Sequence, residues 1–164
     1  MARYRFVDHW AIKAPIEQVF DHVSDPTTYP RWWPVYSQVE VVRNGSTSRQ
    51  SQHARLVVKS ALGYSLKLDV ETTESNPPHY LKTVSRGNLE GTGEWTFEQQ
   101  GDTTHATWIW TVESQHRLLN LLEPIAKSLF AWSHNDASRK GHQGLKKLLE
   151  QDNQVAQAER ERDE

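Results

Sequence analysis

One histidine in the C-terminal third of the chain is of a type that could carry acid–base chemistry. His134 lies in residues 124–150, which contain no proline after the first position and are expected to form one long helix. Histidine exchanges protons near neutral pH, so His134 could donate a hydrogen bond to a ligand carbonyl or shuttle a proton. The alternative is a structural histidine bonded to a backbone group. Ser133 and Asp136 complete the residue types of a nucleophilic triad, but side chains that project in different directions from one helix cannot form the required hydrogen-bonded chain.

Other common catalytic and metal-binding arrangements are absent from the sequence. The chain has no cysteine, which excludes disulfides, thiolate chemistry and cysteine-based zinc sites. His134 and His142 would lie ~12 Å apart along a helix axis, and there is no HExxH motif, so we expect no metal. Gly91 and Gly93 lie within a strand pattern that no helix follows, so they do not form a phosphate-binding loop. We expect no cofactor.

The apolar face of the segment 124–150 is lined mostly by small residues. A helix packed on a core usually fills such a face with large aliphatic side chains. Small residues there indicate either that a sheet approaches the helix closely or that the helix covers a cavity. His134 lies at the edge of this face. At ~100° per residue, the residues within one arc are Ala126, Phe130, Ser133, Ala137, Gly141, Gly144 and Leu148.

A β-rich region precedes this helix. Two short helices are expected after the first strand, one opening at Pro15 and one of a single turn at residues 29–34. Helical structure is expected to begin again at 117–122. The order predicts an α+β fold with its helices on one side of an antiparallel sheet. Alternating apolar and polar residues predict strands at 4–12, 35–43, 49–60, 64–73, 80–86, 89–99 and 103–114.

Aromatic residues on the last strands could form the walls of a cavity beneath the long helix. Trp108 and Trp110 share one face of their strand. Aromatic walls opposite small helix residues are typical of an apolar ligand pocket. The alternative is an ordinary core in which the glycines bring the helix close to the sheet. The candidate ligand-binding residues on these elements are Trp95, Trp108, Trp110, Phe130, Ser133, His134, Ala137 and Gly141.

Composition narrows the class of protein. With 164 residues, a net charge of −2 and scattered lysines and arginines, the chain is expected to be one domain that does not bind nucleic acid. No apolar run is long enough to cross a bilayer and the first residues are unlike a signal peptide, so we expect a soluble, cytoplasmic protein. We expect a domain over residues 1–150 and a polar charged tail over 151–164, either a helical extension or disordered. The oligomeric state is not indicated.

Three strings resemble the helix-grip superfamily, which includes START domains, the plant pathogenesis-related allergen fold and bacterial polyketide cyclases. The first is APIEQVF at 14–20, followed by SDP at 24–26, and the second is YPRWWP at 29–34. The third, WSHN at 132–135 followed by Gly141 and Gly144, is similar to a helix of the bacterial polyketide cyclase/dehydrase branch. LEGTGEW at 89–95 is a weaker match to that branch. Together the matches cover residues 4–150.

The resemblance implies a curved seven-stranded sheet around the C-terminal helix, two short helices between the first two strands, and an apolar cavity. Members bind lipids, sterols, plant hormones or polyketides, and some are aromatase/cyclases. In those enzymes a tyrosine in the spacing of Tyr36 lines the pocket as a candidate acid. They also present an arginine inside the cavity, whereas alternation places neither Arg55 nor Arg86 there. In the family, an aspartate usually follows the histidine that matches His134. Here Asn135 takes that position, so the neighbouring residue supplies no carboxylate for an acid–base pair.

The two adjacent tryptophans of the YPRWWP string are not both expected to be buried. Neighbours on one helical turn point ~100° apart, so one of Trp32 and Trp33 should face the interior. We favour Trp33. The other tryptophan could close the cavity mouth or contact a partner.

Three functions are consistent with this sequence. The favoured one is a carrier or sensor of a small hydrophobic ligand, such as a lipid, isoprenoid or polyketide-like molecule, with Ser133, His134 and Tyr36 as polar anchors. The second is a polyketide cyclase, aromatase or dehydratase that uses Tyr36 or His134 as its acid or base. The third is a protein-interaction module that uses the tail and one exposed tryptophan.

Overall fold

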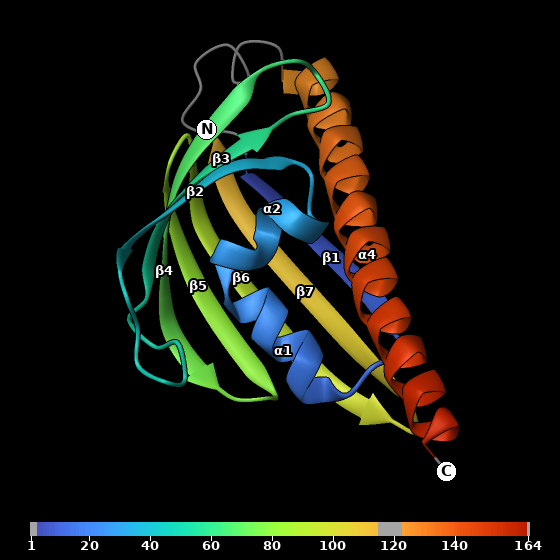
Figure 1. Ribbon diagram of the computed structural model, residues 1–164. Helices are drawn as coiled ribbons and strands as arrows, with labels where there is room; N and C mark the ends of the chain where they lie inside the picture. The colour runs from blue at the N-terminus through green and yellow to red at the C-terminus, as the bar shows by residue number, and fades with distance from the viewer. Residues whose placement is uncertain (1–2, 115–122, 164) are drawn as a thin grey trace.

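One antiparallel sheet forms the body of the molecule (Figure 1). The computed structural model describes residues 3–114 and 123–163. In this part of the chain, seven strands pair in the order β1-β7-β6-β5-β4-β3-β2. The arrangement confirms the predicted helix-grip fold. The strands are β1 Arg3–Ile12, β2 Tyr36–Arg43, β3 His53–Lys59, β4 Ser65–Asn76, β5 Tyr80–Gly87, β6 Leu89–Gln100 and β7 Thr103–Ser114.

The helices lie against the concave face of the curved sheet. Figure 1 shows α1, Ile16–Ser24, and α2, Tyr29–Trp32, beside the long helix α4, Glu123–Arg162. A one-turn helix, η1, connects α1 to α2 at Pro26–Thr28. The predicted helical start at 117–122 lies outside the described residues. At 1.5 Å per residue, the 40 residues of α4 span ~60 Å. Because α4 continues to Arg162, the segment 151–162 of the predicted tail is helical.

Two contacts at the start of α1 hold α4 in place beside it. The backbone N–H of Lys13 donates to Glu150 Oε1 over 3.0 Å, and Asn153 Nδ2 donates to Gln18 Oε1 over 3.2 Å. These bonds join the middle of α4 to the start of α1. No helix in the described residues is long and apolar enough to cross a membrane.

The strand β3 begins later than the alternating pattern indicated. The predicted strand covered residues 49–60, whereas β3 starts at His53. Arg49 and Ser51 have φ angles of 70° and 66°, which is left-handed backbone that turns the chain. The pairing with β4 is therefore extended only by Ser51 and Gln52, through backbone bonds to Thr72.

Trp32 and Trp33 are both buried, at 3 % and 2 % exposure, so the prediction that only one would be was wrong. The helix α2 ends at Trp32, and Trp33 has φ −118° and ψ 86°, so the two side chains do not follow helical geometry. Trp33 Nε1 donates to the carbonyl of Ala137 over 2.8 Å, and Trp32 Nε1 donates to Thr28 Oγ1 over 3.0 Å. The carbonyl oxygen of Trp32 lies where a Cβ of Gly144 would have to go.

The apolar core forms two clusters. One surrounds Trp10, Trp33 and Trp95, beneath α1 and α2. The other surrounds Leu56 and Phe130, near the start of α4, and Tyr36 packs against both. The space between the clusters is the site described next.

Candidate ligand-binding site

A cavity of about 130 Å³ lies between the concave face of the sheet and the helices. An engineered cavity of about 150 Å³ in another protein holds one benzene molecule, so the free space here suits a single ring. Apolar side chains make up most of the wall. The predicted ligand-binding residues that line it are Trp33, Tyr36, Trp95, Trp108, Trp110, Phe130, Ser133, His134 and Ala137.

Gly141 lies outside the cavity lining. A Cβ at Gly141 would come within 2.5 Å of the Trp33 ring and 2.8 Å of the Trp10 ring. Real Cβ atoms do not approach other atoms so closely, and only glycine fits. The small-residue face of α4 therefore has two parts. Gly141 allows close packing against tryptophans, whereas Ser133 and Ala137 face the cavity.

His134 is paired with a carboxylate on the first strand. Its Nε2 lies 2.7 Å from Asp8 Oδ2, and the two side chains are 3 % and 15 % exposed. Because a carboxylate only accepts, Nε2 carries the hydrogen. Nδ1 accepts a hydrogen bond when the ring is neutral and donates one when the ring is protonated. The sequence left open a ligand contact or a bond to the backbone, and the partner found is a side chain. Asp8 supplies the carboxylate that Asn135 does not.

Aromatic rings fix the plane of the His134 imidazole. The ring stacks on Phe6 at 4.0 Å and 13°, and lies 5.2 Å from Trp110 at 21°. Trp108 is 5.3 Å away. A ring held by one hydrogen bond and by stacking keeps a single orientation, as a hydrogen-bonding or proton-transferring group requires.

Tyr36, the first residue of β2, lies between two other aromatic rings. Its ring centroid is 4.9 Å from that of Tyr29 and 4.9 Å from that of Trp33. Burial raises the pKa of Tyr36, and burial is also the main cause that raises the pKa of Tyr29. Tyr36 therefore keeps its proton at neutral pH. Its hydroxyl can donate a hydrogen bond to a ligand but does not act as a base there.

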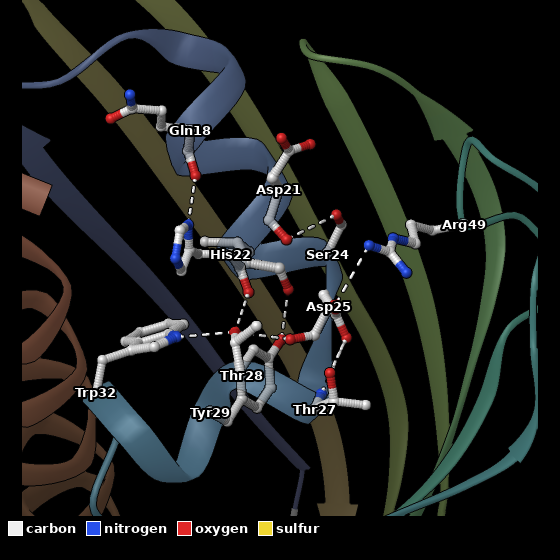
Figure 2. A network of polar contacts seen from close by, with 11 residues as sticks. Gln18, Asp21, His22, Ser24, Asp25, Thr27, Thr28, Tyr29, Trp32 and Arg49 are labelled. Atoms are coloured by element: carbon white, nitrogen blue, oxygen red, sulfur yellow. Dashed lines mark hydrogen bonds and ion pairs between the residues drawn. The ribbon is translucent and has the colours of Figure 1, made fainter. Parts of the chain in front are cut away.

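The turn between α1 and α2 closes one end of the cavity, and polar contacts hold this turn (Figure 2). Tyr29 OH donates to the carbonyl of Val23 over 2.5 Å, and Thr28 Oγ1 donates to the carbonyl of Asp25 over 2.8 Å. The β2–β3 connection is joined to the turn through Arg49, whose guanidinium lies 3.2 Å from the Asp25 carboxylate. Val23 and Tyr29 contribute to the cavity wall at this end.

The opposite end of the cavity is more exposed. Lys59 at the end of β3 is exposed, and Ser133 on α4 is half-buried. The hydroxyls of Ser60 and Ser133 lie 3.1 Å apart and connect the β3–β4 turn to α4. This hydrogen bond lies at the end of the cavity where Lys59 is exposed.

Two buried polar atoms on the cavity wall have no hydrogen-bond partner in the described part of the chain. They are Oε1 of Gln52, just before β3, and the hydroxyl of Tyr64, just before β4. By contrast, the hydroxyls of Thr83 and Ser85 on β5 donate to backbone carbonyls over 3.4 and 3.2 Å. Buried polar atoms without partners are uncommon and destabilise the folded state, so these two require an explanation.

Asp8, Gln52 and Thr72 were missed in the sequence, although a signal for each was present. Asp8 occupies the alternate position between Phe6 and Trp10 on the inward face of β1. Gln52 and Thr72 likewise continue the inward faces of β3 and β4. A polar residue in phase with a buried apolar face needs a partner or a function, and this rule would have selected all three.

The charged groups around the cavity are few. No arginine is among the described lining residues; Arg55 points outward and donates to Asp69 over 3.2 Å, and Arg86 is exposed. The described residues also contain no group of three histidines, aspartates or glutamates that could hold a metal ion. The site is therefore an apolar cavity with a few neutral polar groups, one His–Asp pair and Lys59 at its exposed end.

Residues 4–150 match a family model described as polyketide cyclase/dehydrase and lipid transport. Curated proteins gave no match.

Solved structures share the fold at low sequence identity. The Zhui aromatase/cyclase from a Streptomyces species has a TM-score of 0.75 at 15 % identity, with 91 % of this chain and 94 % of that chain covered. A START superfamily protein from Mycobacterium smegmatis has a TM-score of 0.73 at 18 %, with 90 % and 97 % covered. The di-domain ARO/CYC BexL from the BE-7585A biosynthetic pathway has a TM-score of 0.73 at 21 %; 90 % of this chain is covered, and it spans 50 % of that chain.

Proposed function

The chain belongs to the polyketide cyclase/dehydrase and lipid-transport family, and on that premise we propose that it binds one small hydrophobic molecule, as a carrier or sensor. The observation that carries the proposal is the cavity of about 130 Å³ with aromatic walls between the sheet and α4. Burial of apolar ligand surface contributes about 25 cal/mol per Å² and is the main driving force. Candidate ligands are small members of the lipid, isoprenoid and polyketide-like classes, since the free space suits a single ring.

A few polar groups would orient the ligand within the apolar wall. Tyr36 offers a neutral hydroxyl, and Nδ1 of His134, whose Nε2 is bonded to Asp8, accepts from a ligand when the ring is neutral and donates when it is protonated. Ser133 already shares a hydrogen bond with Ser60 at the exposed end, so a ligand that contacts Ser133 replaces or extends that bond. Such sparse polar contacts give orientation and specificity to binding that is otherwise apolar.

Native mass spectrometry of the protein purified from its own host tests this proposal. We expect a mass increment of one small molecule per chain, which extraction would then identify. A protein that stays empty after exposure to mixed lipids and aromatic polyketides contradicts the proposal.

An enzyme of the cyclase, aromatase or dehydratase type is the second candidate, favoured by the His134–Asp8 pair at the cavity wall. A neutral His134 oriented by Asp8 at 2.7 Å could take a proton from a carbon next to a ketone. The hydroxyl of Tyr36 could donate to the carbonyl oxygen that gains charge in this step. The absence of arginine from the described lining distinguishes this cavity from the arginine-containing pockets expected of aromatase/cyclases.

Turnover of a poly-β-ketone analogue tests the enzymatic candidate. Tyr36→Phe and His134→Ala should each lower the rate at least tenfold while the analogue still binds. Equal turnover by wild-type protein and both variants, or no turnover by wild-type protein, contradicts catalysis and leaves the binding proposal standing.

A further inference from the structure

Gln52 places an unsatisfied amide at the buried end of the cavity. The residue is 4 % exposed and lines the cavity, and its Oε1 has no hydrogen-bond partner among the described residues. An unpartnered buried amide oxygen is unfavourable in the empty protein, and a ligand that donates a hydrogen to it removes that penalty. The amide oxygen of Gln52 therefore favours a ligand that has a hydrogen-bond donor at this end of the cavity.

A second polar side chain lies beside Gln52 on the neighbouring strand. The N–H of Thr72 donates to the carbonyl of Gln52 over 2.9 Å, and the N–H of Ser51 donates to the carbonyl of Thr72 over 2.8 Å. These bonds continue the antiparallel register of β3 and β4, in which directly opposite residues present their side chains to one face. Thr72 is 5 % exposed and also lines the cavity. An amide and a hydroxyl are thus adjacent on one wall.

The guanidinium of Arg49 and the imidazole of His22, which lie near this end, are held by other partners. The guanidinium of Arg49 is paired with the Asp25 carboxylate at 3.2 Å, as Figure 2 shows. The Nδ1 of His22 lies 2.8 Å from the carbonyl oxygen of Gln18 within α1. An anionic ligand group placed beside Gln52 would be buried without a counter-ion and would meet an amide oxygen, which is strongly unfavourable.

We propose that Gln52 and Thr72 recognise a neutral hydrogen-bond donor, an O–H or N–H group, at the buried end of the ligand. This inference rests on the proposed function, because it specifies the class of molecule that the cavity holds. The ligand is a neutral amphiphile with a hydroxyl or N–H on an apolar body. An ionised carboxylic acid is disfavoured at this end, because it would be buried without a counter-ion: the nearby guanidinium of Arg49 is paired with Asp25.

The two ends of the cavity differ in a way that sets the orientation of the ligand. Gln52 and Thr72 are buried, whereas Lys59 at the opposite end is exposed. The donor group therefore enters first and the rest of the molecule extends toward the β3–β4 turn. Any charged substituent lies at the Lys59 end, within reach of solvent.

Three probes that differ only in their polar group test this inference. They are 4-propylphenol, which is neutral and donates a hydrogen bond, 4-propylanisole, which only accepts, and 4-propylbenzoate, which is ionised at pH 7. Each is measured with the full chain at pH 7 by titration calorimetry. We expect the phenol to bind about tenfold more tightly than the other two, because one hydrogen bond to a buried unpartnered group is worth about a factor of ten.

Two variants assign the preference to one end of the cavity. Gln52→Leu should reduce the preference for the phenol over the anisole to less than about twofold while the anisole still binds. Gln50→Leu is the matched control, because it makes the same chemical change at an exposed glutamine outside the cavity lining, and it should leave the preference unchanged. Equal binding of phenol and anisole by the wild-type protein overturns the inference. A preference that survives Gln52→Leu, or that is lost in Gln50→Leu, overturns it too. In these cases the cavity still binds, and the proposed function stands.

Failure of all three probes to bind contradicts the proposed function together with the inference.

Discussion

His134 and Asp8 are separated by 126 positions in the chain, yet His134 Nε2 lies 2.7 Å from Asp8 Oδ2. The contact joins the first strand to the C-terminal helix at the cavity wall. It also determines which imidazole nitrogen carries the hydrogen and which one can accept. Both proposed functions depend on this arrangement, one for ligand orientation and the other for proton transfer.

Asp8→Ala should destabilise the protein by about 1–3 kcal/mol, because it leaves the N–H of a buried imidazole without a partner. Chemical denaturation measures this loss. Long-range proton–nitrogen NMR should place the hydrogen on Nε2 of His134 in the wild-type protein and show mixed tautomers in the variant. His9→Ala is the control, because the His9 side chain contacts Thr107 on the exposed side. Equal stability losses in the two variants would contradict the role of the pair.

Gly144→Ala should destabilise the protein by about 1–3 kcal/mol through overpacking. A glycine-to-alanine change inside a helix normally stabilises by about 0.5–1 kcal/mol, so the expected effect has the opposite sign. The reason is that the new Cβ would overlap the carbonyl oxygen of Trp32. Thermal unfolding, compared with the exposed neighbour Gln143→Ala, measures the difference. A rise in stability for Gly144→Ala would show that α4 is not packed this closely on α2.

Stability should fall as pH rises above about 10. The pKa values of Tyr29 and Tyr36 are raised by burial, so the unfolded chain loses these protons at a lower pH than the folded protein does. Below pH 10 both states are protonated and neither tyrosine contributes a pH dependence. Above it, each contributes a loss of up to about 1.4 kcal/mol per pH unit until its folded-state pKa is reached. Urea unfolding between pH 8 and pH 11 should show a shallower decline for Tyr36→Phe than for the wild-type protein. Identical declines would contradict the burial of the Tyr36 hydroxyl.

Gln52→Leu should stabilise the empty protein by about 1–3 kcal/mol, because it removes an unpartnered buried amide oxygen. The same substitution is expected to remove the preference for donor ligands. A variant that is more stable and binds less selectively is the usual sign of a residue kept for function. Thermal unfolding without ligand measures the change, and a loss of stability would mean that the amide has a structural partner.

The architecture could be predicted from the sequence because the signals are local and repeated. The alternation of apolar and polar residues along β7 predicted a strand, and the small-residue face of α4 predicted a long helix after it. The starts of strands were less predictable. The pattern before β3 continues through Arg49, but left-handed backbone at Arg49 and Ser51 delays the strand to His53. A turn of this kind replaces the pairing that alternation alone predicts.

The site was only partly predictable, because its key relationships join residues distant in sequence. His134 was recognised by its chemistry, but its partner Asp8 lies on a strand whose place beside α4 is set by the whole fold. Gln52 fell inside the predicted strand 49–60, in phase with Ala54 and Leu56, but it was missed because the prediction considered only the apolar residues of that face. Gly141 was predicted to leave room for a ligand, whereas the space above it is filled by the Trp33 ring. The spacing of residues along a helix predicts which face is buried. It does not predict which part of that face packs against another side chain and which part faces a cavity.

Binding of 4-propylphenol to a cavity-blocked variant tests the central claim most directly. Ala137 lines the cavity, and Ala137→Phe places a ring in the free space. Trp132→Ala on the same helix is the control, because Trp132 is 54 % exposed and points outward. Titration calorimetry should show one bound molecule per chain for the wild-type protein and Trp132→Ala, and at least tenfold weaker binding for Ala137→Phe. Equal binding by all three proteins, or binding by none, would contradict a ligand site between the sheet and α4.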